Sequence, residues 1–120
     1  MSVYNGEKYL RKSINSILNQ TFSDYEFLII DDASTDSSRD IILCYDDPRM
    51  KLIENEQNIG QSESLNRGLE KAEGKYIARM DQDDISLPQR LEKQVRFMND
   101  NDKIGVCGTM AQFINSDGKV

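Results

Sequence analysis

Three aspartates, Asp81, Asp83 and Asp84, occupy four positions directly after the apolar run at residues 75–80. Carboxylates this close repel one another, and a bound divalent cation relieves that repulsion. Mg²⁺ and Mn²⁺ prefer a few carboxylate oxygens and keep positions for water and substrate phosphates. The D-x-D spacing suits such a site because alternate residues of an extended segment point the same way. The alternative is that these aspartates are solvated turn residues that cap the next helix.

A second acidic pair, Asp31 and Asp32, ends the apolar run at residues 25–32 and is followed by Ser34. These aspartates either cap the following helix or leave a carboxylate that accepts a hydrogen bond from the N–H edge of a nucleobase. Tyr4, near the start of the chain, fits either a core aromatic residue or a stacking surface for a base. The residues alone leave these alternatives open.

The composition excludes several kinds of chemistry. The chain has no histidine, which removes His-ligated zinc and Ser-His catalysis, so any catalysis depends on carboxylates. Its net charge is −6 and it has no basic stripe, so nucleic acid is not an expected partner. Cys44 and Cys107 stand among apolar residues and are expected to be reduced core thiols. No apolar run suits a membrane span or a signal peptide, so we expect a cytoplasmic chain, peripheral at most to the inner face of the membrane.

Alternating helix and strand patterns must position these residues. Strands are expected at residues 25–32, 50–55, 75–80 and 104–114, with a turn at 115–119. Helical patterns precede each of these strands, which implies right-handed βαβ crossovers and a mostly parallel sheet with helices on both faces. The fold class is therefore an α/β three-layer sandwich, formed by residues 1–120 as a single domain. Ligands bind outside the carboxyl ends of such strands, so both acidic groups are expected on one rim.

The first helix, at residues 7–20, is expected to be capped by Asn5. The last begins near Pro88 and is expected to turn Leu91, Val95 and Met98 inward. Two further helices are expected between them, one through Ile41, Ile42 and Tyr45 and one through Leu65, Leu69 and Ala72.

Taken together, these motifs resemble the N-terminal, nucleotide-sugar-binding half of family 2 glycosyltransferases, which are inverting enzymes with the GT-A fold. The resemblance covers nearly all 120 residues and rests on "SVYNGEKYLRKSINSILNQTFSDYEFLIIDDASTD", "NIGQSESLNRGLEKAEGKYIARMDQDD" and "LPQRL". It implies transfer of a sugar from a nucleotide-diphosphate sugar, with UDP expected, to an acceptor hydroxyl. It also implies Mg²⁺ or Mn²⁺ as cofactor, and a glycan or lipid-linked acceptor in cell-surface polysaccharide or lipid-linked oligosaccharide synthesis.

The resemblance also implies roles for individual residues. Tyr4 would stack on the uracil with Ser2 beside it. Asp32 would hydrogen-bond the base, while Asp31 and Ser34 shape the loop.

At the other acidic group, Asp83 would hold the metal that bridges the diphosphate. Asp81 would lie toward the ribose and diphosphate and share the metal site, whereas no role is implied for Asp84. Arg79 and Arg90 are expected to form salt bridges with these aspartates, or to help neutralise the site.

This chain departs from the family pattern at both ends. Family members are longer, and their general base lies in a later segment, so the catalytic base is expected beyond Val120. Their first strand begins several residues before the segment that Ser2 starts here. We therefore expect a truncated GT-A domain that does not transfer sugar unaided, with a non-catalytic nucleotide-binding fragment as the alternative. A receiver domain and a haloacid dehalogenase phosphatase fit less well, because their acidic motifs come earlier in the chain.

Overall fold

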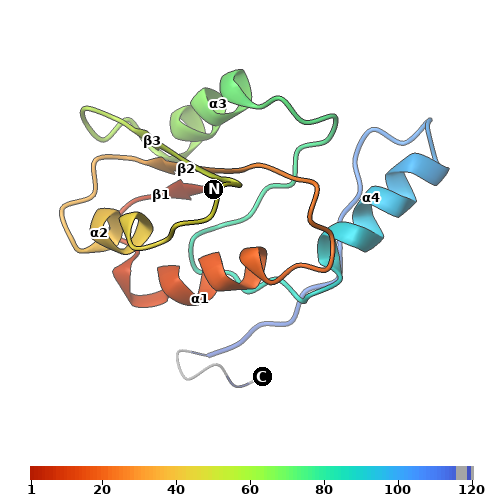
Figure 1. Ribbon diagram of the computed structural model, residues 1–120, viewed down its shortest axis with the longest axis horizontal. Helices are drawn as coiled ribbons and strands as arrows, with labels where there is room; N and C mark the ends of the chain where they lie inside the picture. The colour runs from red at the N-terminus through yellow and green to blue at the C-terminus, as the bar shows by residue number, and fades with distance from the viewer. Residues whose placement is uncertain (116–118, 120) are drawn as a thin grey trace.

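The computed structural model describes residues 1–115 and 119. Strands and helices alternate through its first 71 residues and a further helix follows, as Figure 1 shows. The elements are, in chain order, β1 (Ser2–Val3), α1 (Glu7–Leu18), β2 (Phe27–Asp31), α2 (Ser38–Leu43), β3 (Met50–Glu54), α3 (Gln61–Lys71) and α4 (Arg90–Asp100). None of the helices in this described part is long and apolar enough to cross a membrane. The turn expected at residues 115–119 falls mainly on residues 116–118, outside the described part.

The strands form a parallel sheet in the order β1, β2, β3. β2 pairs with β3 along its whole length, from Phe27 opposite Met50 to Asp31 opposite Glu54, whereas β1 contributes two residues. Helices α1 and α2 cover one face of the sheet and α3 covers the other (Figure 1). The predicted three-layer α/β architecture is thus confirmed, and the carboxyl ends of the strands meet at one edge.

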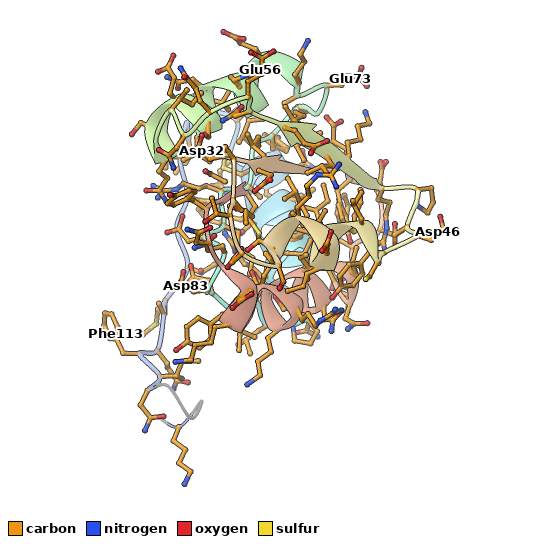
Figure 2. All side chains as sticks on the ribbon, turned by 90° about the vertical axis from the view of Figure 1, so that its left-hand side faces the viewer. Asp32, Asp46, Glu56, Glu73, Asp83 and Phe113 are labelled. Atoms are coloured by element: carbon orange, nitrogen blue, oxygen red, sulfur yellow. The ribbon has the colours of Figure 1, made fainter. Side chains whose placement is uncertain are left out.

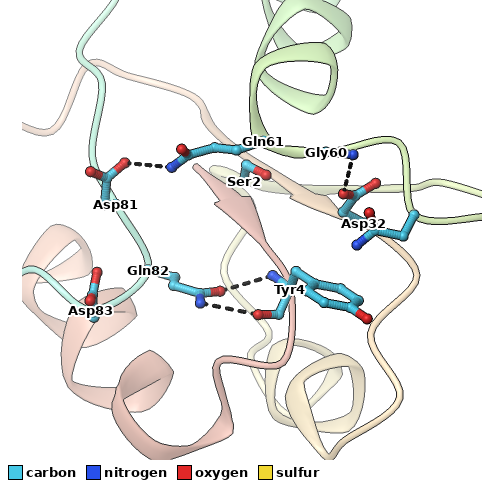
Figure 3. Close-up of a pocket in the computed structure, with 9 residues that line it drawn as sticks. Ser2, Tyr4, Asp32, Gly60, Gln61, Asp81, Gln82 and Asp83 are labelled. Carbon is cyan, nitrogen blue, oxygen red and sulfur yellow. Dashed lines mark hydrogen bonds between the residues drawn. The ribbon is translucent and has the colours of Figure 1, made fainter.

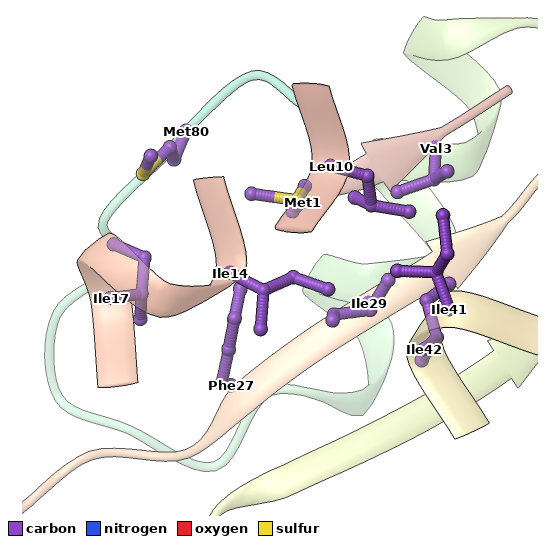
Figure 4. Close-up of a cluster of buried hydrophobic side chains, with 10 residues drawn as sticks. All are labelled: Met1, Val3, Leu10, Ile14, Ile17, Phe27, Ile29, Ile41, Ile42 and Met80. Carbon is purple, nitrogen blue, oxygen red and sulfur yellow. The ribbon is translucent and has the colours of Figure 1, made fainter. Parts of the chain in front are cut away.

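Neighbouring residues of β2 point to opposite faces and build the two sides of the core. Ile29 is fully buried in the cluster beneath α1 and α2 (Figure 4), whereas Ile30 lies against α3. A Cβ on Gly68 of α3 would lie 2.8 Å from the Cδ1 atom of Ile30, so this glycine lets the helix approach the sheet closely. The cluster beneath α1 and α2 contains Met1, Val3, Leu10, Ile14, Ile17, Phe27, Ile29, Ile41, Ile42 and Met80.

The start of α1 differs from the prediction. Gly6, and not Asn5, stands at the N-terminus of the helix, and it makes no side-chain cap. Asn5 adopts a left-handed backbone with φ 49, which asparagine tolerates better than most residues. Its side-chain oxygen accepts a hydrogen bond from the N–H of Thr35 at 2.8 Å. Asn5 therefore ties the start of α1 to the loop after β2.

The strands predicted at residues 75–80 and 104–114 are wrong. Neither segment forms a strand, and Ile77, Met110 and Phe113 are 57%, 100% and 93% exposed. Figure 2 shows Phe113 on an arm that extends away from the body of the molecule. An apolar run becomes a strand only where another backbone pairs with it, and β1 offers two residues at its edge of the sheet.

The two cysteines and α4 also differ from the predictions. Cys44 is exposed and Cys107 is half-buried, so neither is a core thiol. Ile41 and Ile42 fill the core side of α2, which leaves Cys44 on the outer side of its last turn. In α4, Leu91 is buried, but the other two predicted core residues, Val95 and Met98, are half-buried. Figure 1 shows the reason, since α4 lies beside the sheet and does not cover either face.

Candidate functional site

The carboxyl ends of the strands border a cavity of about 450 Å³ (Figure 3). It is lined by Ser2, Tyr4, Asp32, Asn58, Gly60, Gln61, Asp81, Gln82 and Asp83. Ser2 is a nearly buried residue of β1. Figure 2 shows that Asp32 and Asp83 lie on the same side of the molecule. The structure therefore brings together five predicted binding residues from three separate parts of the chain.

Asp32, directly after β2, is almost completely buried, with 1% of its surface exposed. Its carboxylate accepts hydrogen bonds from the Asn55 side chain at 2.7 Å and from the backbone N–H groups of Ile59 and Gly60 at 2.9 and 2.8 Å. Burial acts to raise the pKa of Asp32, but these hydrogen bonds together outweigh it and the pKa is lowered. The Ser64 side chain also lowers the pKa of Asp32 through a hydrogen bond, so protein donors fill about four acceptor positions of the carboxylate.

Gly60 closes the loop between β3 and α3 over this carboxylate. Its backbone, with φ 89 and ψ 159, has a conformation that essentially only glycine adopts. A Cβ at this position would meet no atom within 4 Å. Any cost of a side chain here therefore arises from the backbone alone.

We expect Gly60→Ala to lower the free energy of unfolding by about 1–3 kcal/mol, the usual cost of such backbone strain. Gly105→Ala is the matched control, because a Cβ there also meets no atom within 4 Å and its φ lies outside the left-handed region. Urea denaturation of both variants measures the difference. Equal stability of the two variants would show that residue 60 relaxes without strain.

Asp31 and Ser34 shape the loop after β2 and do not line the cavity. Ser34 donates hydrogen bonds to the Asp31 carboxylate from both its N–H and its hydroxyl group. The Ser34 hydroxyl also accepts a hydrogen bond from the N–H of Asn5. The first N–H of α2 donates instead to the carboxylate of Asp36 at 2.9 Å. The alternative in which Asp31 and Asp32 cap this helix is therefore wrong.

Tyr4 follows β1 and is 45% exposed, so it is not a core aromatic residue. Its ring lies at the cavity beside Asp32 (Figure 3). The strand before it is held in the sheet by a hydrogen bond from the N–H of Asp32 to the carbonyl oxygen of Val3 at 2.8 Å. An aromatic ring that is exposed at the edge of a cavity and fixed by a strand is suited to stacking on a base.

The D-x-D segment, residues 81–83, brings two carboxylates to the cavity. Asp81 accepts a hydrogen bond from the side chain of Gln61 at 3.2 Å and forms an ion pair with Arg79 at 3.1 Å. Asp83 is exposed and lines the cavity, whereas Asp84 is exposed and lies outside the lining. The segment is not extended as predicted but forms a turn, in which the N–H of Asp84 donates to the carbonyl oxygen of Asp81 at 3.3 Å, and Gln82 lines the cavity as well.

The two arginines near this segment behave differently. Arg79 pairs with Asp81, as expected. Arg90 donates to the carbonyl oxygen of Arg79 at 2.7 Å and to the hydroxyl of Ser86 at 2.9 Å, so its predicted pairing with the aspartates is wrong. Gln89 stands at the start of α4 without a side-chain cap, so the aspartates do not cap this helix either.

Asp81 and Asp83 are suited to a metal ion that is shared with a substrate. Among residues 1–115 and 119, no three or more Asp, Glu, Cys or His side chains lie close enough together to hold an ion by themselves. Mg²⁺ does not require such a group, because it is commonly held by one or two carboxylates together with phosphate oxygens and water. Two carboxylates on one cavity fit that pattern.

The model of the family described as glycosyl transferase family 2 matches residues 1–119. The chain belongs to glycosyl transferase family 2. The uncharacterized glycosyltransferase MJ1057 of Methanocaldococcus jannaschii is 43% identical over 124 residues, which cover 100% of this chain and 43% of that protein. The Escherichia coli UDP-Glc:alpha-D-GlcNAc-diphosphoundecaprenol beta-1,3-glucosyltransferase WfgD is 40% identical over 101 residues, covering 84% of this chain and 40% of that one.

A solved structure supports the same fold. The crystal structure of S. aureus TarS 1-349 in complex with UDP-GlcNAc matches with a TM-score of 0.80 and 30% identity, over 84% of this chain and 30% of that one. The predicted family and GT-A fold are confirmed, and the receiver and phosphatase alternatives are excluded. The chain spans less than half the length of these three relatives.

Four residues that line the cavity are absent from the predicted set, namely Asn58, Gly60, Gln61 and Gln82. Asn58 and Gly60 belong to the loop after β3 and Gln61 is the first residue of α3, and the carboxyl end of β3 shares an edge with the ends of β1 and β2. The rule that predicted the aspartates at strand ends would have found this loop as well. Gln82 carries no charge and gives no comparable signal in the sequence.

Proposed function

We propose that this chain binds a nucleotide-diphosphate sugar, with UDP as the nucleotide, and forms the donor-binding part of an inverting glycosyltransferase. The observation that carries the proposal is the meeting of Tyr4, Asp32 and the D-x-D segment around one cavity. A volume of about 450 Å³ is in the usual range for small-molecule sites. The similarity to TarS, whose crystal structure contains UDP-GlcNAc, supports the choice of donor.

In this proposal the base end of the donor lies between Tyr4 and Asp32. The ring of Tyr4 stacks on the uracil, and Ser2 lies beside it. The Asp32 carboxylate, which lines the cavity, takes a hydrogen bond from the N–H of the base in place of one of its protein donors. The hydrogen bonds that lower the pKa of Asp32 keep this acceptor ionised even though it is buried.

The diphosphate end lies against the D-x-D segment, where Asp83 and Asp81 would hold Mg²⁺ or Mn²⁺. Bound there, the ion supplies positive charge that stabilises the diphosphate and the departing UDP. Without a cation, an acidic cavity in a chain of net charge −6 repels a nucleotide. Asp81 is already engaged by Gln61 and Arg79, which leaves Asp83 as the main ligand.

The proposed reaction is attack of an acceptor hydroxyl on the anomeric carbon of the sugar. The bond from this carbon to the diphosphate oxygen breaks, and the configuration inverts. We assign no general base to the described residues, and propose that the base and the acceptor contacts belong to the further length found in the relatives. The name of WfgD, which specifies a diphosphoundecaprenol-linked acceptor, supports a role in lipid-linked glycan or cell-surface polysaccharide synthesis, which we propose takes place at the inner face of the membrane.

Calorimetric titration with UDP tests the proposal. We expect binding in the presence of Mn²⁺ or Mg²⁺ and its loss when a chelator removes the ion, because the carboxylates then repel the diphosphate. Uridine, which has no diphosphate, is the matched ligand, and its weaker binding is expected to be independent of the metal. UDP affinity that is the same with and without metal would overturn the metal site, and no affinity in either case would overturn the donor assignment.

A further inference from the structure

Gln82 lies between the two aspartates of the D-x-D segment, and its side-chain amide faces the backbone of Tyr4 (Figure 3). The N–H of Tyr4 donates to Oε1 of Gln82 at 2.9 Å, and Nε2 of Gln82 donates to the carbonyl oxygen of Tyr4 at 3.1 Å. The amide therefore pairs with one backbone residue as a neighbouring strand would. This pair joins two segments that are 78 residues apart in the sequence.

Gly6 leaves the space that this pair occupies. A Cβ on Gly6 would lie 2.6 Å from Oε1 of Gln82, closer than Cβ atoms approach a neighbour, so the Gln82 side chain would have to move. The φ of Gly6 is −102, which any residue adopts, so a side chain at position 6 would act by displacing the flexible end of Gln82 and not by straining the backbone. The amide of Gln82 thus occupies the space that a side chain at position 6 would take.

The segments on either side of the pair are anchored independently of each other. On the strand side, the N–H of Asn5 donates to the Ser34 hydroxyl at 3.1 Å, and Val3 is bonded within the sheet. On the D-x-D side, the Ser13 hydroxyl donates to the carbonyl oxygen of Asp81 at 3.3 Å. The amide of Gln82 is the link that joins the Tyr4 backbone directly to the D-x-D segment.

We propose that Gln82 is a positioning residue that fixes the metal-binding carboxylate of Asp83 relative to the base-stacking ring of Tyr4. The inference rests on the proposed function, because this distance matters only to a ligand that contacts both groups. UDP with Mn²⁺ spans both, whereas uridine contacts the Tyr4 end alone. Loss of the amide removes the direct link between Tyr4 and the D-x-D segment, while the other anchors of both segments remain.

The test compares Gln82→Ala with Gln57→Ala, a control at an exposed glutamine outside the cavity lining. For Gln82→Ala we expect roughly tenfold weaker binding of UDP at saturating Mn²⁺, and uridine binding that changes by less than about twofold. Gln57→Ala is expected to leave both affinities unchanged. Calorimetry measures UDP, ligand-observed NMR measures uridine, and thermal unfolding verifies that each variant is folded.

A second variant tests the geometry without removing the amide. Gly6→Ala is expected to displace the Gln82 side chain and to weaken UDP binding to a similar degree. In the Gln82→Ala background the same change is expected to have no further effect, because the atom that it displaces is gone. Additive losses in the double variant would contradict the pairing.

The outcomes separate this inference from the proposed function. Wild-type binding of UDP together with unchanged binding by Gln82→Ala overturns the role of Gln82 alone. Equal losses for UDP and uridine overturn it as well, since they indicate a general disturbance of the site. Failure of the wild-type chain to bind UDP overturns the proposed function and this inference with it.

Discussion

Replacing Asp83 with asparagine is expected to abolish metal-dependent UDP binding, with a loss of about 100-fold or more in affinity at fixed Mn²⁺ concentration. The substitution keeps the size of the side chain and removes its charge. Asp83 is exposed at the cavity, so the change leaves the core intact. Asp81 is a poor substitute as main ligand, because its carboxylate already accepts a hydrogen bond from Gln61 and pairs with Arg79.

Asp84→Asn supplies the control for this prediction. Asp84 is the next residue, carries the same charge and is also exposed, but it lies outside the cavity lining. We expect its replacement to change UDP affinity by less than about twofold, because an exposed charge without direct contact to the ligand is weakened by solvent and salt. Calorimetry of both variants at one ionic strength makes the comparison. Equal losses would indicate an effect of net charge and would remove Asp83 from the metal site.

The part of the fold that depends on local pattern was predictable from the sequence. Apolar residues at helical spacing predict α1, and the continuous apolar run that ends in Asp31 predicts β2. The position of Asp32 at this edge follows from the rule that parallel strands end together, whereas the D-x-D segment lies there although no strand precedes it. Predicting these features requires only the local sequence pattern and the handedness of βαβ units.

The features that depend on distant partners were not predictable. Residues 75–80 have the composition of a strand, yet whether they form one depends on the length of backbone that β1 offers. Nothing in the sequence distinguishes Gln82 from the other glutamines, because its contacts with Tyr4 and Gly6 form only in the folded chain. The sequence predicts Asn5 as a helix cap, but in the structure its side-chain oxygen accepts a hydrogen bond from the N–H of Thr35 instead. In each case the deciding group is far away in the sequence.

Asp32→Asn is expected to destabilise the fold by about 3 kcal/mol, a large share of the 5–15 kcal/mol that is typical of a domain. One oxygen of the carboxylate accepts from Asn55 and Ile59 and the other accepts from Gly60. An asparagine side chain offers one oxygen and one NH₂ group, so at least one of these donors would face another donor. Asp46→Asn is the control, because Asp46 is exposed and lies far from Asp32 (Figure 2). Urea denaturation near neutral pH measures both variants.

The pH dependence of the stability difference between Asp32→Asn and the wild type shows whether the lost charge causes it. Because the pKa of Asp32 is lowered from 3.8 in the folded chain, the unfolded chain binds more protons as the pH approaches that value. The stability that the carboxylate contributes is therefore present above the ordinary aspartate pKa and is lost as the pH falls through the lower pKa of the folded state. The asparagine variant has no such group, so its difference from the wild type is expected to shrink below about pH 4. A difference that remains constant in acid would mean that the variant suffers from altered packing and that Asp32 does not act as a charged acceptor.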